Sequence, residues 1–167
     1  EKNKFKPLKI NGKIKVFHGI NRSNYYKKGN DVFVQALEQV QEKYSHNIEI
    51  IQVENIPYKD YIKLYNESHI LLDQAYAYDQ GYNALEAMAQ GKVVFSGFSD
   101  GFKSHYDITK NIGIHATPDV EELVKNLSWL IENPKEIIKI GKNARAYIET
   151  YHDYEKVAKT YLDTWNS

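Results

Sequence analysis

The chain has 167 residues, with 22 lysines and arginines balanced by 22 aspartates and glutamates, and it has no cysteine. This length predicts one globular domain, because domains run to roughly 100–200 residues. The charge balance removes the basic surface on which nucleic-acid binding rests. The lack of cysteine excludes disulfides, thiolate metal sites and a cysteine nucleophile, and it favours a reducing compartment. No apolar run approaches the roughly 20 residues of a membrane span, and no signal peptide is recognisable.

The N-terminal region predicts a linker. Residues 1–12 form this linker, since the first fifteen residues carry six lysines and Pro7 without apolar periodicity. Attraction of these lysines to an anionic membrane surface is the alternative interpretation. The single methionine is Met88, so we expect the sequence to be cut from a longer protein, with processing of a natural terminus as the alternative. Residues 13–167 form the predicted domain.

The first predicted unit is a strand followed by a helix. Residues 14–18 alternate in polarity and end at a glycine, which predicts a strand and a turn. Apolar residues at helical spacing then predict a helix to about Tyr44, with Asn30 or Asp31 as its N-cap. Residues 48–53 predict the next strand.

The strand–helix alternation continues through the middle of the chain. Residues 57–68 predict a helix with proline in its first turn, and 69–73 predict a short buried strand. A third helix is expected at 81–90, with Gly91 as its C′ residue. The β-branched run 92–96 predicts a fourth strand that is covered on both faces.

The C-terminal third is expected to be mainly helical. The polar segment 97–101 predicts a loop, and 113–115 a short fifth strand. Apolar periodicity then predicts helices at 119–132 and 134–151 and a last helix from Asp153.

This order predicts an α/β fold, a three-layer, Rossmann-like, doubly wound parallel sheet with a helical C-terminal tail. Strands that alternate with helices of ten or more residues indicate βαβ crossovers. Such sheets bind ligands beyond the carboxyl ends of their strands. The loops that follow His18, Val53, Asp73 and Ser96 are therefore the places to search for a site.

Several standard signatures are absent from these loops. No Gly-x-Gly-x-x-Gly follows the first strand, and the sequence has no P-loop, His-Glu-x-x-His or Gly-x-Ser-x-Gly motif. It has no Asp-x-Asp pair to hold a divalent ion, and its six histidines never fall at zinc-ligand spacing. We therefore expect neither a cofactor nor a metal.

The first group of residues that suggests chemistry is the loop at 19–29. It places Arg22 and Lys28 at the carboxyl edge of the sheet, beside a helix N-terminus. A guanidinium fork, an ammonium group and exposed helix amides are suited to binding a diphosphate. The alternative is that both side chains are simply solvated.

The second group lies at 79–91. Gly81 allows the backbone to turn sharply into the helix, with its neighbouring amides directed over the sheet. Glu86 lies among alanines on that helix, where a carboxylate needs partners such as the two hydroxyls of a ribose. The alternative is a solvent-facing glutamate that the helix dipole stabilises.

Together these segments resemble the C-terminal domain of retaining GT-B glycosyltransferases, the group 1 or family 4 enzymes that include sucrose and glycogen synthases and many bacterial polysaccharide enzymes. The resemblance covers nearly the whole chain. It rests on the Gly19, Arg22 and Lys28-Gly29 opening, on 56–65 and on 68–73. It rests above all on Glu86-Ala-Met-Ala-Gln-Gly-Lys-Val-Val94, which is very close to the family's Glu-Ala-Met-Ala-x-Gly-x-Pro-Val.

The resemblance implies that this domain binds a nucleotide-sugar donor without a metal. Arg22 and Lys28 would grip the diphosphate and stabilise the departing nucleoside diphosphate as catalytic groups. Glu86 matches the second of two family glutamates, the one that holds the ribose hydroxyls. The other implied donor-binding residues are Gly19, Asp79, Gly81 and Tyr82, and the base edge is assigned to Val53, Asn55 and Ile56.

Two departures from the family pattern bear on the donor sugar. The family's first glutamate falls at Tyr78, and the nearest acid is Asp79, one place later. Either Asp79 takes that role through a small loop shift, or the sugar is contacted differently, or donor chemistry is lost. The loop at 96–102 also lacks the family's Gly-Gly-x-x-Glu pattern, so the sugar identity is open.

The implied function is the donor-binding half of a hexosyltransferase that acts with retention in polysaccharide or glycoconjugate synthesis. Its acceptor, a glycan or lipid-linked glycan, would bind an N-terminal domain outside this sequence, so we expect the isolated domain to transfer no sugar. The expected location is the cytoplasm, with peripheral association at the inner membrane face as an alternative. The other interpretations are a non-catalytic GT-B-like scaffold or partner domain, a GT-B epimerase and a receiver-like signalling domain.

Overall fold

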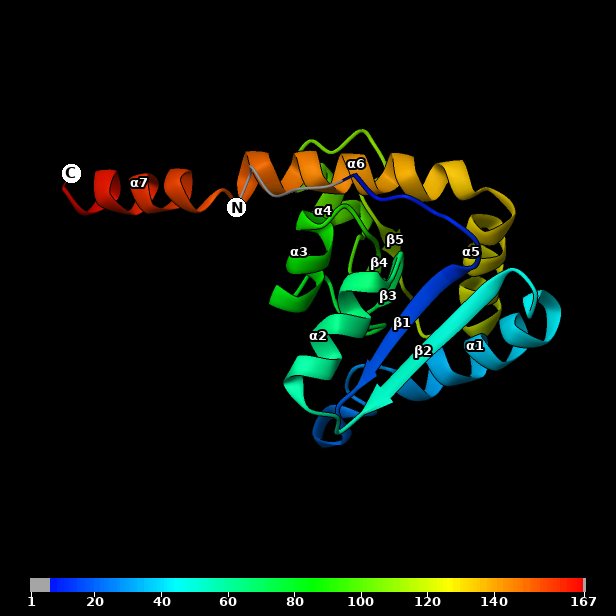
Figure 1. The fold of residues 1–167 in the computed structure, drawn as a ribbon. Coiled ribbons are helices and arrows are strands. Elements are labelled where there is room, and N and C mark those ends of the chain that lie inside the picture. The colour runs from blue at the N-terminus through cyan, green and yellow to red at the C-terminus, as the bar shows by residue number, and fades with distance from the viewer. Residues whose placement is uncertain (1–6, 167) are drawn as a thin grey trace.

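The computed structural model describes residues 7–166, and these form a single parallel sheet flanked by helices (Figure 1). The strands pair in the order β2-β1-β3-β4-β5, and every pairing is parallel. The strands are β1 (Ile14–Ile20), β2 (Ile48–Glu54), β3 (Ile70–Leu72), β4 (Val93–Ser96) and β5 (Ile114–His115). Residues 1–6 of the predicted linker lie outside the described residues, and residues 7–13 contain neither helix nor strand.

Helices cover both faces of this sheet, which confirms the three-layer, doubly wound prediction. The helices are α1 (Asn30–Tyr44), α2 (Tyr58–Glu67), α3 (Tyr82–Ala89), α4 (Asp100–His105), α5 (Val120–Glu132), α6 (Pro134–Tyr151) and α7 (Tyr154–Trp165). A short 3₁₀ turn, η2, spans Arg22–Asn24. Helices α1 and α5 pack together on one face, and α2 and α3 lie on the other (Figure 1). Helix α6 runs across the end of the sheet and contributes side chains to both apolar layers (Figure 1).

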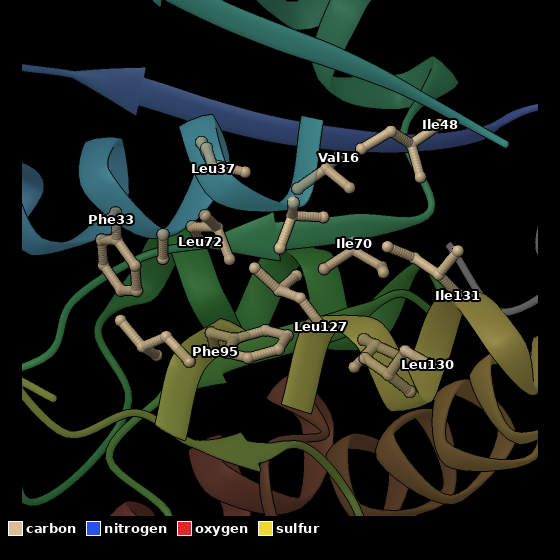
Figure 2. Packing of buried hydrophobic residues seen from close by; sticks show 14 of the residues in the cluster. Val16, Phe33, Leu37, Ile48, Ile70, Leu72, Phe95, Leu127, Leu130 and Ile131 are labelled. Carbon is tan, nitrogen blue, oxygen red and sulfur yellow. The ribbon is translucent and has the colours of Figure 1, made fainter. Parts of the chain in front are cut away.

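Alternation along the strands divides the core into two apolar layers. Val16 and Leu72 lie in the layer beneath α1 and α5, where they meet Phe33 and Leu127 (Figure 2). Phe17, the neighbour of Val16, points to the opposite layer, because successive strand side chains face opposite ways. Each such buried side chain contributes about 1.5–3 kcal/mol.

Two local predictions are wrong. Helix α1 is not capped by Asn30 or Asp31, because its N-cap is Gly29, whose left-handed backbone (φ 73°) is favoured by glycine. The segment 97–101 is not entirely loop, since Ser99 caps the six-residue helix α4 by accepting a hydrogen bond from the Phe102 amide. That helix was missed because it is too short to show an apolar period.

The strand order sets the place of a ligand site. From β1 the chain moves to β2 at one edge of the sheet and then returns past β1 to β3. The connections therefore leave β1 and β3 in opposite directions, which opens a crevice at the carboxyl ends of these two strands. The loops that follow β1 and β3 form the walls of this crevice.

The helical tail is confirmed, and its last helix stands apart from the rest of the domain. Helix α7 has no buried residue and extends away from the sheet (Figure 1). Asp153 caps it by accepting hydrogen bonds from two backbone amides. Among the described helices, none is both long enough and apolar enough to span a membrane.

Candidate functional site

The loops after β1 and β3 meet through an ion pair. Lys28 ends the first loop, and its Nζ donates a 3.0 Å hydrogen bond to Oδ1 of Asp73, the residue that follows β3. The Asp73 side chain is 1% exposed, whereas that of Lys28 is 29% exposed. The predicted phosphate ligand Lys28 therefore lies at the topological crevice, with its ammonium group held against a buried carboxylate.

Further contacts fix this pair in place. The second Asp73 oxygen, Oδ2, accepts a hydrogen bond from Ser96 Oγ at 3.2 Å. The backbone amide of Ala75 donates to the carbonyl of Lys28 at 2.9 Å. A Cβ atom on Gly29 would come within 2.8 Å of the Ala75 Cβ, so the two loops approach closely only because residue 29 is glycine.

Arg22 is also paired with an acid, but near the surface. Its Nε donates to Glu54 Oε1 at 2.6 Å, and its guanidinium lies 4.9 Å from the ring centre of Tyr25. The Arg22 side chain is 62% exposed. The hydrogen bond with Glu54 raises the pKa of Arg22, and the same bond lowers the pKa of Glu54.

The predicted base-edge residues lie at the same end of the sheet, because β2 runs parallel to β1. Glu54 ends β2, and exposed Asn55 follows it with a left-handed backbone (φ 52°). Ile56 is half-buried, and Val53 packs partly against the second apolar layer. Asn55 is therefore more accessible than Val53 or Ile56.

The predicted ribose ligand, Glu86, lies on the side of α3 that faces α2. Glu86 is exposed, and its charge adds to burial in raising the pKa values of Tyr61 and Tyr65. Tyr61 also lies against Gly19, since a Cβ on Gly19 would be 3.0 Å from the Tyr61 ring. The aromatic side chain of Tyr61 is thus near both Gly19 and Glu86, which the sequence had not indicated.

The N-terminus of α3 is open, but not for the predicted reason. Gly81 has an extended backbone (φ −79°, ψ 171°) that any residue can adopt, so a sharp turn does not require glycine there. A Cβ on Gly81 would meet no heavy atom within 4 Å, and Tyr82 beside it is exposed. The α3 N-terminus has no side-chain cap, which leaves its first amides available to an anion.

The Tyr78–Asp79 segment lies directly on the end of β4. Gly97 makes this possible, because a Cβ there would be 2.5 Å from the Ala77 carbonyl oxygen. The Asp79 carbonyl oxygen lies 3.4 Å from Ser96 Oγ, as an alternative acceptor for the single hydroxyl hydrogen that Asp73 accepts at 3.2 Å. The Asp79 side chain is exposed. Tyr78 is 88% exposed and borders a hollow of about 270 Å³.

Within residues 7–166, no three His, Cys, Asp or Glu side chains converge in a way that could hold a metal ion. The two predicted phosphate-binding cations at this edge are Lys28 and Arg22. They come from a single loop but point to different partners, one at β3 and one at β2.

Comparison with known families identifies the domain. The profile of the family described as glycosyl transferase-like matches residues 17–163. This chain belongs to that family. A search of curated proteins gives no match.

Solved structures show the same fold as this glycosyl transferase-like domain. The C-terminal domain of the group 1 glycosyl transferase LpcC from Francisella tularensis has a TM-score of 0.63 at 19% identity, over 87% of this chain and 89% of that one. Staphylococcus aureus TarM, in complex with fondaparinux, α-GlcNAc-glycerol and UDP, has a TM-score of 0.69 at 16% identity, over 93% of this chain and 36% of that one. Anabaena HepE, with UDP and glucose, has a TM-score of 0.66 at 16% identity, over 93% of this chain and 48% of that one.

These likenesses show the Rossmann-like fold of a GT-B C-terminal domain. The glycosyl transferase-like chain spans about a third of TarM and half of HepE, but most of the LpcC domain. It therefore corresponds to one domain of these larger structures.

Sequence reasoning missed the acids that accompany the two cations, and it missed Tyr61. Asp73 follows β3 and Glu54 ends β2, so both stand at the carboxyl ends of strands, where a parallel sheet places its ligand-facing groups. This position is a signal that the sequence contained. Tyr61 gave no such signal, because its helix pattern resembles that of an ordinary amphipathic helix.

Proposed function

We propose that this domain binds the nucleotide-sugar donor of a glycosyltransferase at the crevice between β1 and β3. One observation carries the proposal: Lys28 and Arg22 leave a single loop at the point where the strand order reverses. The open N-terminus of α3 follows the loop after β3 at the same edge. Two cations and a set of free amides are what a diphosphate requires.

The chemistry assigned to these groups is electrostatic. Arg22 and Lys28 stabilise the negative charge that develops on the nucleoside diphosphate as the glycosidic bond to the sugar breaks. No metal is needed for this step, because the two side chains supply the positive charge. Glu86 accepts hydrogen bonds from the ribose hydroxyls, next to Tyr61.

The full reaction is hexose transfer with retention to a glycan or lipid-linked glycan, in polysaccharide or glycoconjugate synthesis. The acceptor binds a second domain, as the size of the larger relatives suggests. The hollow of about 270 Å³ beside Tyr78 is near the lower end of the roughly 300–1,000 Å³ of ligand pockets, and we assign it to the sugar of the donor. We expect this domain alone to bind the donor without transferring sugar.

Titration calorimetry with UDP tests the proposal, because UDP is bound in the TarM and HepE structures. We expect weak binding that Arg22→Gln and Glu86→Gln each reduce about tenfold, the effect of losing one charge-assisted hydrogen bond. The matched controls are Lys110→Gln and Glu42→Gln, exposed residues that lie before β5 and near the C-terminal end of α1, at the opposite edge of the sheet. Failure of UDP, ADP and GDP to bind the unaltered domain would contradict the proposal.

A non-catalytic relative is the second candidate, favoured by Tyr78 at the position of the expected glutamate. Asp79 is exposed at the same edge and could replace that glutamate. Asp79→Asn separates the two candidates when binding of UDP-glucose is compared with binding of UDP. In a donor site we expect it to weaken UDP-glucose selectively, whereas in a scaffold it changes neither affinity.

A further inference from the structure

Each predicted phosphate cation has its own carboxylate, and the two carboxylates differ in burial. We infer that Asp73 is a positioning residue that holds the Lys28 ammonium group toward the ligand, whereas Glu54 competes with the ligand for Arg22. This inference rests on the proposed function. It assigns opposite effects on anion binding to two acids that carry the same charge.

The first step is the fixed position of Asp73. Its side chain is 1% exposed, and each carboxylate oxygen has a donor, Lys28 on one and Ser96 on the other. Its backbone amide donates to the Phe95 carbonyl at 3.0 Å, which ties it to β4. A carboxylate held from both ends in this way has no alternative position to occupy.

The second step concerns what Lys28 has left to offer. An ammonium group has three donors, and the contact with Asp73 uses one. Because 29% of the Lys28 side chain is exposed, the remaining donors can reach a ligand at the carboxyl edge. An arriving diphosphate can therefore bind Lys28 without displacing Asp73. Because the ion pair already orders this long, flexible side chain, ligand binding loses less conformational entropy.

The third step is the contrast with Arg22. Its side chain is 62% exposed and Glu54 is 29% exposed, so solvent and ligands reach both partners. Glu54 bonds to Nε, the guanidinium atom nearest the chain, and so favours an Arg22 position directed toward β2. The Nη hydrogens of Arg22 remain available, but β2 and β3 lie on opposite sides of β1, so the whole guanidinium can turn toward the β3 side of the crevice only when this exposed bond breaks. Exposed pairs of this kind are easily exchanged.

Electrostatics alone and positioning predict different outcomes for the two acids. Replacing either acid by its amide adds one unit of positive charge to the edge, so charge alone predicts tighter UDP binding in both variants. Positioning predicts that the two variants change the affinity for UDP in opposite directions. Asp73→Asn should bind UDP about tenfold more weakly, and Glu54→Gln about twofold to fivefold more tightly.

Calorimetry with UDP and with uridine provides the test. We expect the Asp73→Asn loss to appear with UDP and to be absent with uridine, which has no phosphate for Lys28. A general loosening of the fold would weaken both ligands alike. Ser96→Ala removes one anchor of Asp73 and should give a smaller loss in the same direction. Tighter UDP binding by Asp73→Asn would overturn the inference.

A measurement without ligand keeps the inference separate from the proposed function. Amine acylation followed by mass spectrometry compares Lys28 with Lys27, its exposed neighbour. In the unaltered protein we expect Lys28 to react several-fold more slowly than Lys27. Both Asp73→Asn and Ser96→Ala should raise the Lys28 rate toward that of Lys27. If the Lys28 rate is unchanged in both variants, Asp73 does not hold Lys28, even if the domain binds UDP. If UDP fails to bind but the rates change as expected, the proposed function is at fault and the positioning contact stands.

Discussion

Two lysines lie at opposite edges of the sheet, and the protein accommodates their charges in different ways. At the carboxyl edge, Lys28 is partly exposed and paired with the carboxylate of Asp73. At the amino edge, Lys92 precedes β4, is 1% exposed, and donates to the carbonyl oxygens of Asn66 at 3.0 Å and Ser68 at 2.5 Å. Lys92 also lies 5.6 Å from the ring centre of Tyr65.

The difference shows which edge is suited to a ligand. Lys92 uses its donors on the C-terminal end of α2, where the helix dipole and unpaired carbonyls favour a cation. Burial lowers the pKa of Lys92 to about 8, because carbonyl groups compensate less than a carboxylate does. Lys92 is therefore a structural link between α2 and β4, while Lys28 keeps donors available at the surface.

The largest expected effect is the loss of the lysine at the carboxyl edge. Lys28→Met leaves Asp73 buried with Ser96 as its remaining side-chain partner. Removing one partner of a buried ion pair is costly, so we expect the free energy of unfolding to fall by about 4 kcal/mol in urea titrations.

The control is the double variant Lys28→Met/Asp73→Asn, which removes both charges together. It should recover most of that loss, because no charge is then buried without a partner. Equal stability of the single and double variants would mean that the Lys28–Asp73 ion pair does not stabilise the fold. Lys28 would then not differ from Lys92 by having its charge balanced by a carboxylate.

The second effect concerns the amino edge and appears as a rise in stability with pH. The pKa of Lys92 is about 8 in the folded protein and about 10.4 in an unfolded chain. Between these values the unfolded chain binds more protons, so raising the pH favours the folded state. We expect a gain of about 1.5 kcal/mol between pH 8 and 9.5, as measured by urea unfolding.

Lys92→Met serves as the control for this pH dependence. In this variant the free energy of unfolding should rise less steeply with pH over the same range, whatever its absolute value. Burial raises the pKa of Tyr61, and any change that the tyrosines add to the slope is common to both proteins and cancels in the comparison. An unaltered slope in Lys92→Met would show that Lys92 is fully charged in the folded protein and does not differ from Lys28 in the proposed way.

The strands and helices that form both edges could be predicted from the sequence, whereas the side-chain ion pairs could not. Strands and helices repeat with periods that one segment displays by itself, so all five strands and the long helices could be located. The Lys28–Asp73 contact joins residues 45 apart, and Arg22–Glu54 joins residues 32 apart. Such contacts depend on how the strands are ordered, which no local pattern contains. The prediction of a cationic edge was possible, but its neutralising acids were not found.

The Asn30 cap shows how tertiary contacts override a local signal. Asparagine before an apolar periodic run is a good N-cap by local chemistry. In the structure Asn30 is buried, its Oδ1 bonds to Nε2 of His18 at 2.8 Å, and its amide donates to the Tyr25 carbonyl. The side chain thus connects β1 to the cationic loop, and Gly29 takes the cap position instead.

The smallest effect compares one histidine at each edge. His18 lies in β1 near the carboxyl edge and His69 precedes β3 at the amino edge, and burial lowers the pKa of both. A lowered pKa means that the unfolded chain binds more protons as the pH falls below about 6.5, so acid destabilises the folded state. Each histidine can contribute at most about 1.4 kcal/mol per pH unit, and His18→Gln and His69→Gln should each reduce the slope between pH 7 and 5.

Binding measurements should separate the two histidines where stability does not. His18 bonds to Asn30, which holds the Tyr25 carbonyl in the loop that carries Arg22 and Lys28. His69 accepts a hydrogen bond from the Lys15 amide at Nδ1, far from that loop. At pH 7, where both variants are folded, His18→Gln should weaken UDP binding by a few-fold, because the loop loses one anchor, and His69→Gln should leave the affinity unchanged. Equal losses in the two variants would mean that the carboxyl edge does not depend on this anchor.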